Sequence, residues 1–438
     1  MSKRHLVLGI GSNIQPLLKL RQALFELKNN SIFQVLKISS IYESNALLPE
    51  SAPAEWEQKF LNAAVFCQTE ESDLEKILIE IKNIEKKLGR IPSQRWAPRF
   101  IDIDLLWADG ERYQSDTLNV PHLELFQRPF ALCPAIEVCP AILKVEKDFL
   151  PSWILRQSEK PFATQRSEKY FWPRFVGILN ITTDSFSDGG LYLDEEKFIT
   201  KAQQLIGDGA EVLDLGAEST RPGAAKISIQ QEIQRLEQAL SWVEKHRLQI
   251  PLSIDSRNFE TQNHLLNRFP IQYVNDVSGL SDLRMLELLK KHPEVKAVVM
   301  HSLTIPADPQ VHLPLEADLS VYLCDWWRQI LKQAESEKIS SERLIFDPGI
   351  GFGKTASQSW DILKNLSAYQ EIKNDIYLGF SRKSFLKTVT NAEPADRDAI
   401  SATVFSHINL LYCQYLRVHD VQSHVQALKV KYAVNEFV

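Results

Sequence analysis

Residues 175–180 read FVGILN, a short apolar run that ends in a polar residue, and the recurrence of this pattern decides the fold. Seven similar runs follow, at 211–215, 252–255, 273–277, 297–300, 344–347, 377–380 and 416–419. Segments of helical periodicity separate them, for example at 195–206, 229–242 and 283–291. Eight strand–helix units in about 265 residues are typical of an α/β TIM barrel, a (β/α)₈ fold. An open doubly wound sheet usually has fewer strands and a glycine-rich phosphate turn after the first strand, which this sequence lacks.

The first half of the chain has a different rhythm. Its apolar, β-branched stretches predict strands at 4–10, 32–41, 60–68 and 101–107. Its amphipathic stretches predict helices at 17–27 and 72–88. This mixture predicts an α+β domain with an antiparallel sheet of the ferredoxin-like kind. The polar, aperiodic segment RQSEKPFATQRSEKY (156–170) predicts a linker, so we expect an N-terminal domain over 1–155, a linker over 156–173 and the barrel over 174–438.

Composition limits the classes of function. The 438 residues carry a net charge of -6 and a pI near 6.0, which gives no reason to expect a nucleic-acid or anionic-membrane surface. Five cysteines without a CxxC pair argue against a disulfide framework and a zinc site. No apolar stretch approaches the ~20 residues of a membrane span, and the apolar run near the N-terminus is too short for a signal peptide. We therefore expect a cytoplasmic protein.

Polar residues follow almost every predicted barrel strand. They include Asn180, Asp255, Asn275, His301, Asp347, Lys383, Arg417 and His419. One such residue more often caps a helix or forms a turn than carries chemistry. Active sites of these barrels lie at the C-terminal ends of the strands, so eight polar strand ends favour one shared binding site. The cations Arg221, Lys383 and Arg417 suit an anionic substrate.

Seven motifs, in order, resemble the dihydropteroate synthase family. They are GILNITTDSFSDGG (177–190), ESTRPG (218–223), SIDS (253–256), NDVSG (275–279), DPGIGFGK (347–354), GFSRKS (379–384) and RVHD (417–420). The resemblance implies condensation of 6-hydroxymethyl-7,8-dihydropterin pyrophosphate with p-aminobenzoate, in a site that sulfonamides also occupy in this family. The first loop departs from the family pattern, because Thr183 stands where proline is usual.

The resemblance also implies a role for each motif residue. The pterin would be held by Asp255, Asn275, Asp347 and Lys383. The pyrophosphate would be held by Asn180, Thr220, Arg221, Arg417 and His419, with one Mg²⁺ near Asn180. The p-aminobenzoate pocket would be formed by Phe186, Arg221, Pro222, Phe352 and Ser381. Asp188 on the first loop would stabilise a cationic pterin intermediate, and Lys383 and Arg221 would complete the catalytic set.

The most informative string of the N-terminal half is RWAPRFIDIDLLW (95–107). On a strand, Asp102 and Asp104 face the same side, and two such carboxylates repel each other unless a cation lies between them. Mg²⁺ is usually held by one or two carboxylates together with phosphate oxygens. Positive groups that could meet a triphosphate lie nearby in sequence at Arg90, Arg95, Arg99, His122 and Arg128. The alternative is the solvent-facing edge of an amphipathic strand.

This string resembles 6-hydroxymethyl-7,8-dihydropterin pyrophosphokinase, together with Gly11-Ser12-Asn13, FLNAA (60–64), VPH (120–122) and RPF (128–130). The resemblance implies transfer of pyrophosphate from ATP to the pterin, with release of AMP. Asp102 and Asp104 would bind two Mg²⁺ ions on ATP. The phosphates would be positioned by Arg90, Arg95, Arg99, His122 and Arg128, with Trp96 beside them. Asn62 would hydrogen-bond the pterin, and Phe60 and Phe130 would stack on its two faces.

Two alternatives stay open. One half could be a non-catalytic scaffold, although retention of Asp102, Asp104 and Lys383 speaks against it. The barrel could also belong to a pterin-dependent methyltransferase, but SRKS (381–384) and RVHD (417–420) would then be unexplained. The expected partners are small molecules: ATP, the pterin and p-aminobenzoate. We expect no nucleic-acid or membrane partner, and a homodimer through the barrel is in keeping with the synthase resemblance.

Overall fold

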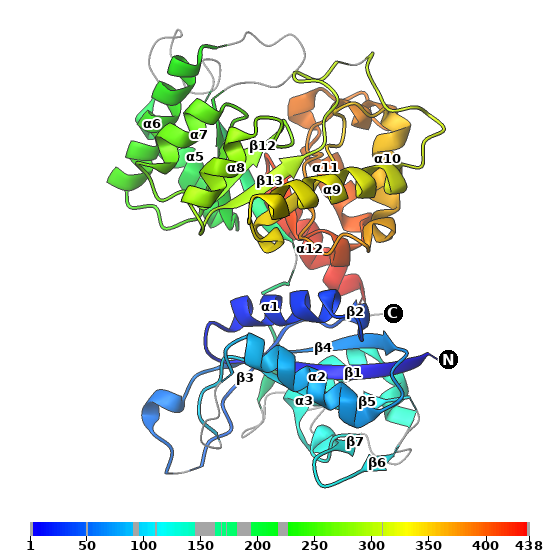
Figure 1. The fold of residues 1–438 in the computed structure, drawn as a ribbon. Helices are drawn as coiled ribbons and strands as arrows, with labels where there is room; N and C mark the ends of the chain where they lie inside the picture. Colours follow the sequence, from blue (N-terminus) through cyan, green and yellow to red (C-terminus); the bar gives the residue numbers. More distant parts are fainter. Residues whose placement is uncertain are drawn as a thin grey trace. The chain divides into compact units, whose positions relative to one another are not determined.

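The computed structural model describes residues 3–49, 51–90, 96–109, 112–144, 163–167, 169–171, 173–181, 194–217, 227–308 and 310–435. Contacts divide the chain into two compact units, residues 1–171 and 172–438 (Figure 1). The first unit contains a six-stranded sheet with helices packed against it, and the second contains an eight-stranded series of parallel strands.

The sheet of the first unit is antiparallel. Its strands are β1 (Arg4–Ser12), β2 (Gln34–Ile38), β3 (Tyr42–Ser44), β4 (Phe60–Thr69), β5 (Asp102–Ala108) and β8 (Thr164–Arg166). They run in the order β5-β1-β4-β3-β8, and β2 pairs with β4 as well. A separate hairpin pairs β6 (Tyr113–Gln114) with β7 (Asn119–Val120). The predicted α+β class with an antiparallel sheet is confirmed.

Two amphipathic helices, α1 (Pro16–Asn29) and α2 (Leu74–Lys87), pack against strands of this sheet. The buried side of α2 repeats at helical spacing with Leu74, Ile77, Ile81 and Ile84. Its start is fixed by the carboxylate of Asp73, which accepts a hydrogen bond of 3.0 Å from the main-chain N–H of Glu75. Burial of this apolar stripe is what holds the helix on the sheet.

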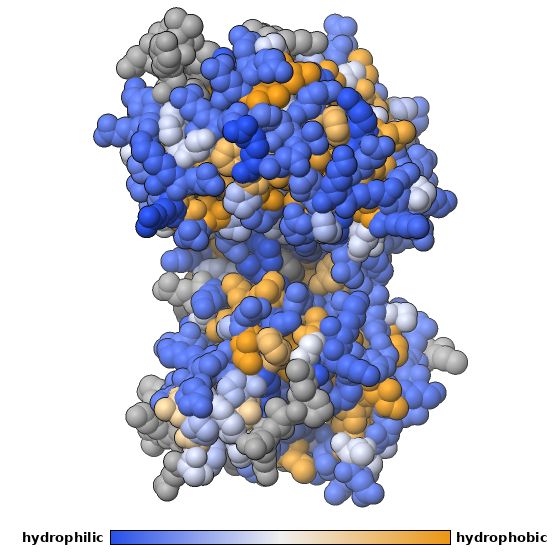
Figure 2. Space-filling model, turned by 60° about the vertical axis from the view of Figure 1, so that its left-hand side comes forward, coloured by the Kyte–Doolittle hydropathy of each residue, from blue (hydrophilic) through white to orange (hydrophobic). Residues whose placement is uncertain are grey.

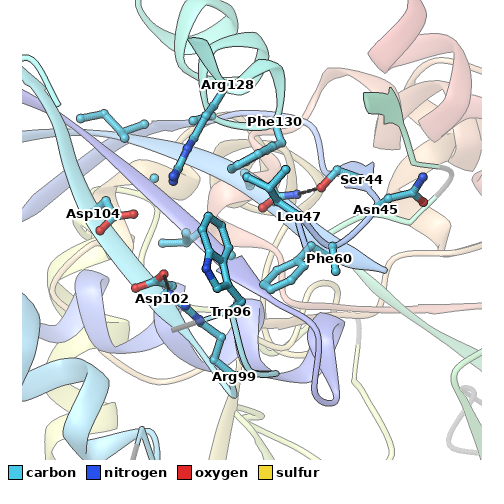
Figure 3. A pocket seen from close by; sticks show the side chains of 18 residues that line it. Ser44, Asn45, Leu47, Phe60, Trp96, Arg99, Asp102, Asp104, Arg128 and Phe130 are labelled. Atoms are coloured by element: carbon cyan, nitrogen blue, oxygen red, sulfur yellow. Dashed lines mark hydrogen bonds and ion pairs between the residues drawn. The ribbon is translucent and has the colours of Figure 1, made fainter. Parts of the chain in front are cut away.

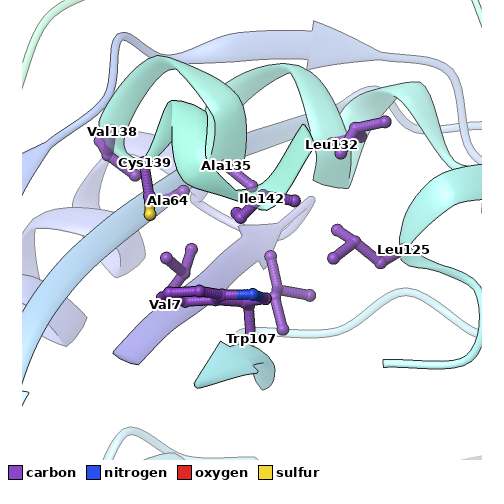
Figure 4. Close-up of a cluster of buried hydrophobic side chains, with 10 residues drawn as sticks. Val7, Ala64, Trp107, Leu125, Leu132, Ala135, Val138, Cys139 and Ile142 are labelled. Atoms are coloured by element: carbon purple, nitrogen blue, oxygen red, sulfur yellow. The ribbon is translucent and has the colours of Figure 1, made fainter. Parts of the chain in front are cut away.

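The third helix of the first unit, α3 (Pro129–Val138), covers a different cluster of apolar side chains (Figure 4). Val7, Ala64 and Trp107 come from three neighbouring strands, and Leu132 and Ala135 come from the helix. All of them are at most 4% exposed. The helix begins at Pro129, whose fixed φ and missing N–H suit the first helical position.

Part of the predicted linker is a strand. Thr164–Arg166 pairs with β3, and the main-chain N–H of Ser167 donates to Ile41 at 2.8 Å. The buried guanidinium of Arg21 also binds the carbonyl of Phe171 at 2.9 Å. The linker interpretation is therefore wrong for these residues, because β3 offers a row of main-chain groups that a polar segment can satisfy. Residues 156–162 lie outside the described residues.

The second unit contains the eight predicted parallel strands. They are β9 (Arg174–Asn180), β10 (Val212–Gly216), β11 (Leu252–Asp255), β12 (Tyr273–Asp276), β13 (Lys296–Met300), β14 (Leu344–Asp347), β15 (Tyr377–Leu378) and β16 (Tyr415–Val418). Their order is β14-β13-β12-β11-β10-β9-β16-β15. A parallel bridge between Phe346 and Ile376 joins the two ends of this series. The predicted TIM barrel is confirmed.

Helices connect successive barrel strands. They are α5 (Glu195–Gly207), α6 (Ile229–Lys245), α7 (Phe259–Leu266), α8 (Arg284–Lys291), α9 (Leu319–Ser336), α10 (Ala356–Lys364) and α11 (Asp398–His407), and α12 (Val421–Asn435) follows the last strand. Reciprocal capping boxes fix the starts of α6 and α10, at Ser228 with Gln231 and at Thr355 with Gln358.

The interior of the barrel has an apolar lower layer. This lower layer consists of Val176, Val212, Tyr273, Val298, Ile345, Tyr377 and Tyr415, each at most 7% exposed. Such layers make the interior of a TIM barrel a packed core rather than a pore. The site must therefore lie above it, toward the C-terminal ends of the strands.

Hydrophilic side chains cover most of the face seen in Figure 2. Large exposed hydrophobic residues are dispersed over different elements, for example Leu18 on α1, Ile79 on α2 and Val321 on α9. In the described part of the chain, no helix is long and apolar enough to cross a membrane.

Candidate active sites

A pocket of about 810 Å³, counting the space open to solvent, lies in the first unit (Figure 3). Strands β1, β3, β4 and β5 and the start of α3 contribute to its walls. The labelled lining residues are Ser44, Asn45, Leu47, Phe60, Trp96, Arg99, Asp102, Asp104, Arg128 and Phe130. Most of the candidate residues from the N-terminal half thus come together here.

Strand alternation sends both aspartates into this pocket. Asp102 lies opposite Gly11 and Asp104 opposite Gly9 on the neighbouring strand, while Ile103 between them is fully buried. Gly11 also lies opposite Asn62 on the other side. Because glycine has no side chain, nothing on β1 stands between the carboxylates and the Asn62 amide.

Two arginines neutralise Asp102. Arg90 Nη1 lies 2.5 Å from its Oδ1, and Arg99 Nη1 lies 2.6 Å from its Oδ2. Burial alone would raise the pKa of Asp102, but the charges of Arg90 and Arg99 outweigh burial and hold the pKa below its usual value. Arg90 also pairs with Glu85 of α2, which is 1% exposed.

Asp104 has no such partner among the residues that the structure describes. Burial and then the charge of Asp102 raise its pKa to about 7. No group of three or more acidic, histidine or cysteine side chains in the described ranges could hold a metal ion alone. Two adjacent carboxylates that need positive charge do fit Mg²⁺ bound jointly by protein and phosphate oxygens.

The other side of the pocket is aromatic and amide-bearing. Phe60, Trp96 and Phe130 all line it, as Figure 3 shows. Asn62 is 7% exposed, and its Nδ2 donates to Ser44 Oγ at 2.9 Å, which fixes the direction of the amide. Such a set can hold a flat heterocycle by stacking and by directed hydrogen bonds.

The other predicted phosphate-binding residues are Arg128, His122 and Arg95. Arg128 lines the pocket and pairs with Glu124 at 2.5 Å. His122 is outside the pocket lining, and burial followed by the charge of Arg128 lowers its pKa. Arg95 lies outside the described residues.

In the barrel, four residues at the C-terminal ends of neighbouring strands lie side by side in one row, and three of them are polar. Asn180, Gly216, Asp255 and Asn275 are successive register partners on β9, β10, β11 and β12. Gly216 leaves a gap in this row, since a Cβ there would lie 3.6 Å from both Asn180 Oδ1 and Asp255 Oδ2. The two flanking side chains can thus approach a common ligand.

Arg417 connects Asp255 of this row to the carboxylate of Asp214, which lies two residues before Gly216 on β10. Its Nε donates to Asp214 Oδ2 and its Nη2 to Asp255 Oδ2, both at 2.6 Å. Asn275 Nδ2 donates to Asp214 Oδ2 at 3.2 Å. Burial raises the pKa of Asp255 to about 7, although the charge of Arg417 opposes this rise.

The opposite side of the barrel brings Asp347 and Lys383 together. Burial raises the pKa of Asp347 and lowers that of Lys383 to about 8, and each charge partly offsets the shift of the other. Lys383 Nζ donates to the Ile350 carbonyl at 2.5 Å and lies 4.7 Å from the centre of the Phe352 ring. Ser381 Oγ lies 3.0 Å from a ring nitrogen of His419.

Five predicted site residues of the barrel lie outside the described residues. They are Phe186, Asp188, Thr220, Arg221 and Pro222, which follow β9 and β10 in the sequence.

Sequence analysis missed three buried polar groups beside these sites: Glu85, Asp214 and Lys354. The signal for Glu85 was an acidic residue at a core position of an amphipathic helix, four residues after Ile81. The signal for Asp214 was a charge within an apolar strand rather than after it. Lys354 closes the DPGIGFGK motif, and its Nζ contacts His301 Nδ1 at 2.7 Å and the carbonyls of His301 and Phe352 at 3.1 and 3.0 Å.

Comparison with known proteins assigns both halves to families. Residues 7–140 match the family described as 7,8-dihydro-6-hydroxymethylpterin-pyrophosphokinase. Residues 176–419 match the family described as pterin binding enzyme. The folate synthesis bifunctional protein of Chlamydia muridarum is 33% identical over 439 residues, which cover 96% of each chain.

Solved structures agree with this assignment. Dihydropteroate synthase from Anaplasma phagocytophilum, with bound 6-hydroxymethylpterin-monophosphate, is 29% identical, has a TM-score of 0.54, and covers 60% of this chain and 99% of that one. A bifunctional HPPK-DHPS mutant from Plasmodium falciparum with pteroate is 19% identical, covers 99% of this chain and 95% of that one, and at a TM-score of 0.55 shares the fold. The chain thus belongs to the family of bifunctional folate synthesis proteins, in which a hydroxymethyldihydropterin pyrophosphokinase domain precedes a dihydropteroate synthase barrel.

Proposed function

We propose that the pocket of the first unit performs the pyrophosphokinase step with Asp102 and Asp104 as the ligands of two Mg²⁺ ions on ATP. In this reaction the hydroxyl of 6-hydroxymethyl-7,8-dihydropterin attacks the β-phosphorus of ATP, and AMP leaves. Bound Mg²⁺ supplies positive charge at the phosphates and holds them in place. The observation that carries the assignment is a pair of partly buried carboxylates that differ in their partners. Among the described residues, Asp102 is paired with two arginines, whereas Asp104 is paired with none.

The arginines have a second task in this proposal. Asp102 is paired with Arg90 and Arg99 in this structure. With Mg²⁺ and ATP bound, Asp102 would hold the cation, and Arg90 and Arg99 would contact the triphosphate together with Arg95, His122 and Arg128. The protein's contribution is then positioning and charge neutralisation rather than covalent chemistry.

The pterin would lie between Phe60 and Phe130 and bond the amide of Asn62. Two observations support this placement. The three residues line one pocket with the aspartates, and the Asn62 amide is oriented by the hydrogen bond that it donates to Ser44 Oγ. Trp96 would close the pocket between the pterin and the phosphates.

In the barrel, the pterin pyrophosphate condenses with p-aminobenzoate to give 7,8-dihydropteroate and pyrophosphate. We propose that the pterin is held by Asp255, Asn275, Asp347 and Lys383, and the pyrophosphate by Asn180, Thr220, Arg221, Arg417 and His419, with one Mg²⁺ near Asn180. Stabilising the departing pyrophosphate lowers the barrier to C–O cleavage. Asp188 would stabilise the resulting cation, which the arylamine then traps.

The arylamine would approach over the loop that follows β14. Phe352 and Ser381 would form this pocket together with Phe186, Arg221 and Pro222. The proposal is supported by Lys383, which contacts the Phe352 ring on one side and the Asp347 carboxylate electrostatically on the other. The pterin and arylamine sites would thus share one wall.

A direct test supplies purified protein with hydroxymethyldihydropterin, ATP, Mg²⁺ and p-aminobenzoate and measures AMP and dihydropteroate by chromatography. Both should form, and dihydropteroate should also form without ATP when pre-made pterin pyrophosphate is given. AMP release without dihydropteroate in the complete mixture, together with no dihydropteroate from pre-made pterin pyrophosphate, would reject the synthase assignment.

We further propose a homodimer through the barrel helices and a cytoplasmic location. Analytical ultracentrifugation of the full chain, which should sediment as twice the 50.2 kDa chain, and fractionation of the source cells test these two points.

A further inference from the structure

Asp214 is a carboxylate in the interior of the barrel. It lies on β10 two residues beyond Val212 of the lower layer, and its exposure is 0%. Apolar side chains usually fill such positions in a TIM barrel. An ionised group there is costly to bury unless it is paired and fully hydrogen-bonded, so its presence needs an explanation.

The carboxylate accepts hydrogen bonds from three other strands. Arg417 Nε on β16 donates at 2.6 Å, Asn275 Nδ2 on β12 at 3.2 Å, and Ser253 Oγ on β11 at 2.5 Å. The first two donors are the residues proposed to bind pyrophosphate and pterin. Asp214 is therefore the one described residue that bonds to both of them.

Its bond to Arg417 fixes the direction of the guanidinium. Arg417 uses Nε for Asp214 and Nη2 for Asp255. Within the described ranges, Nη1 has no hydrogen-bond partner and is available for an anionic oxygen. A planar guanidinium held along one edge by two carboxylates can only present its remaining edge to a ligand.

Bonding geometry distinguishes Asp214 from the other interior carboxylates. Asp255 also bonds to Arg417, but among the described residues Asp214 alone bonds to both Arg417 and Asn275. Orientation of these two side chains is therefore the task that its position supports.

We propose that Asp214 is a positioning residue of the synthase reaction, which aims Arg417 at the pyrophosphate and holds the Asn275 amide toward the pterin. The inference rests on the proposed synthase function. Asp214 touches no substrate itself and acts through the two side chains above it.

The test neutralises this carboxylate in the full-length protein. Asp214→Asn should weaken pyrophosphate binding, measured by calorimetry and by product inhibition, at least tenfold and should lower kcat. KM for p-aminobenzoate should stay within twofold, because neither Phe352 nor Ser381, the two described residues proposed for that pocket, bonds to Asp214. Glu232→Gln is the matched control, since Glu232 is a carboxylate of 1% exposure on α6. It accepts hydrogen bonds from Asn258 at 2.9 Å and from Thr261, neither of which is proposed for the synthase site.

A double-mutant cycle separates positioning from a general structural role. In an Arg417→Ala background, Asp214→Asn should cause no further loss of pyrophosphate affinity. Full additivity, or an equal loss for p-aminobenzoate and pyrophosphate, would overturn the inference. If Asp214→Asn does not fold, Asp214→Glu keeps the charge but moves it, and normal pyrophosphate affinity in that variant would also overturn it.

Assays of the wild-type protein distinguish failure of the proposed synthase function from failure of the role proposed for Asp214. If wild-type protein makes no dihydropteroate from pterin pyrophosphate and p-aminobenzoate, the proposed function fails. If wild-type protein is active and Asp214→Asn binds pyrophosphate normally, only the role of Asp214 fails.

Discussion

Gly11 offers a sharp test of the proposed pterin site, because it lies between the aspartates and the Asn62 amide. In Gly11→Ala the new Cβ would lie 3.0 Å from Asn62 Oδ1, with the next atoms 4.0 Å away. The backbone of Gly11 does not have a positive φ, so alanine fits the strand itself. The Asn62 amide must therefore shift, and its 2.9 Å bond to Ser44 weakens.

The size of the effect follows from this single contact. One hydrogen bond contributes about 0.5–1.5 kcal/mol net, which corresponds to roughly a 2- to 13-fold weaker binding of the pterin. Calorimetric titration with hydroxymethylpterin in the presence of Mg²⁺ and a non-hydrolysable ATP analogue measures it. The affinity for the analogue alone should stay within twofold, because no atom of Asp102 is among the nearest contacts of the new Cβ.

Gly207→Ala is the matched control, since a Cβ there meets nothing within 4 Å. It should change neither affinity. Unchanged pterin binding in Gly11→Ala, or an equal loss of pterin and analogue binding, would refute the proposed position of the pterin beside Asn62.

Two further predictions concern the barrel. Lys354→Met removes the bonds that tie the Phe352 carbonyl to His301, so KM for p-aminobenzoate should rise about tenfold in steady-state assays, equivalent to roughly 1.4 kcal/mol. KM for pterin pyrophosphate should rise less, because Lys354 acts on the Asp347 carboxylate only through its charge, and equal rises would contradict this. Burial lowers the pKa of Lys383 to about 8, so the ammonium loses its proton as pH rises through that value, and KM for pterin pyrophosphate should rise above it. In Lys383→Arg the guanidinium stays charged, and a pH profile that bends in this variant as in wild type would exclude Lys383 as its source.

The fold could be predicted from the sequence where the determining pattern is local. Alternation placed Asp102 and Asp104 on one strand face with Ile103 on the other, and a strand needs only its own residues to show this. Each barrel strand was likewise a run of apolar residues, which can be recognised in the sequence without knowing the strand that it pairs with. The strand Thr164–Arg166 lacked such a pattern, because it pairs with β3 through main-chain groups that every residue carries.

The candidate sites could be predicted only in part, because partners distant in sequence decide them. The motifs named Arg417 and Asn275 but not the carboxylate that holds both, since Asp214 lies 203 and 61 residues away from them. The arginines near Asp102 were expected around the phosphates, whereas two of them pair with Asp102 itself in this structure. Which side chain an arginine contacts depends on the packing around it rather than on its spacing in the sequence.

The central claim is that one chain contains two separate active sites for consecutive steps, and reciprocal variants test it most directly. Asp102→Asn should abolish AMP release from ATP and hydroxymethyldihydropterin but leave dihydropteroate synthesis from pre-made pterin pyrophosphate. Lys383→Ala should do the reverse, because each residue lies in a different compact unit. Loss of both activities in either folded variant would contradict the account.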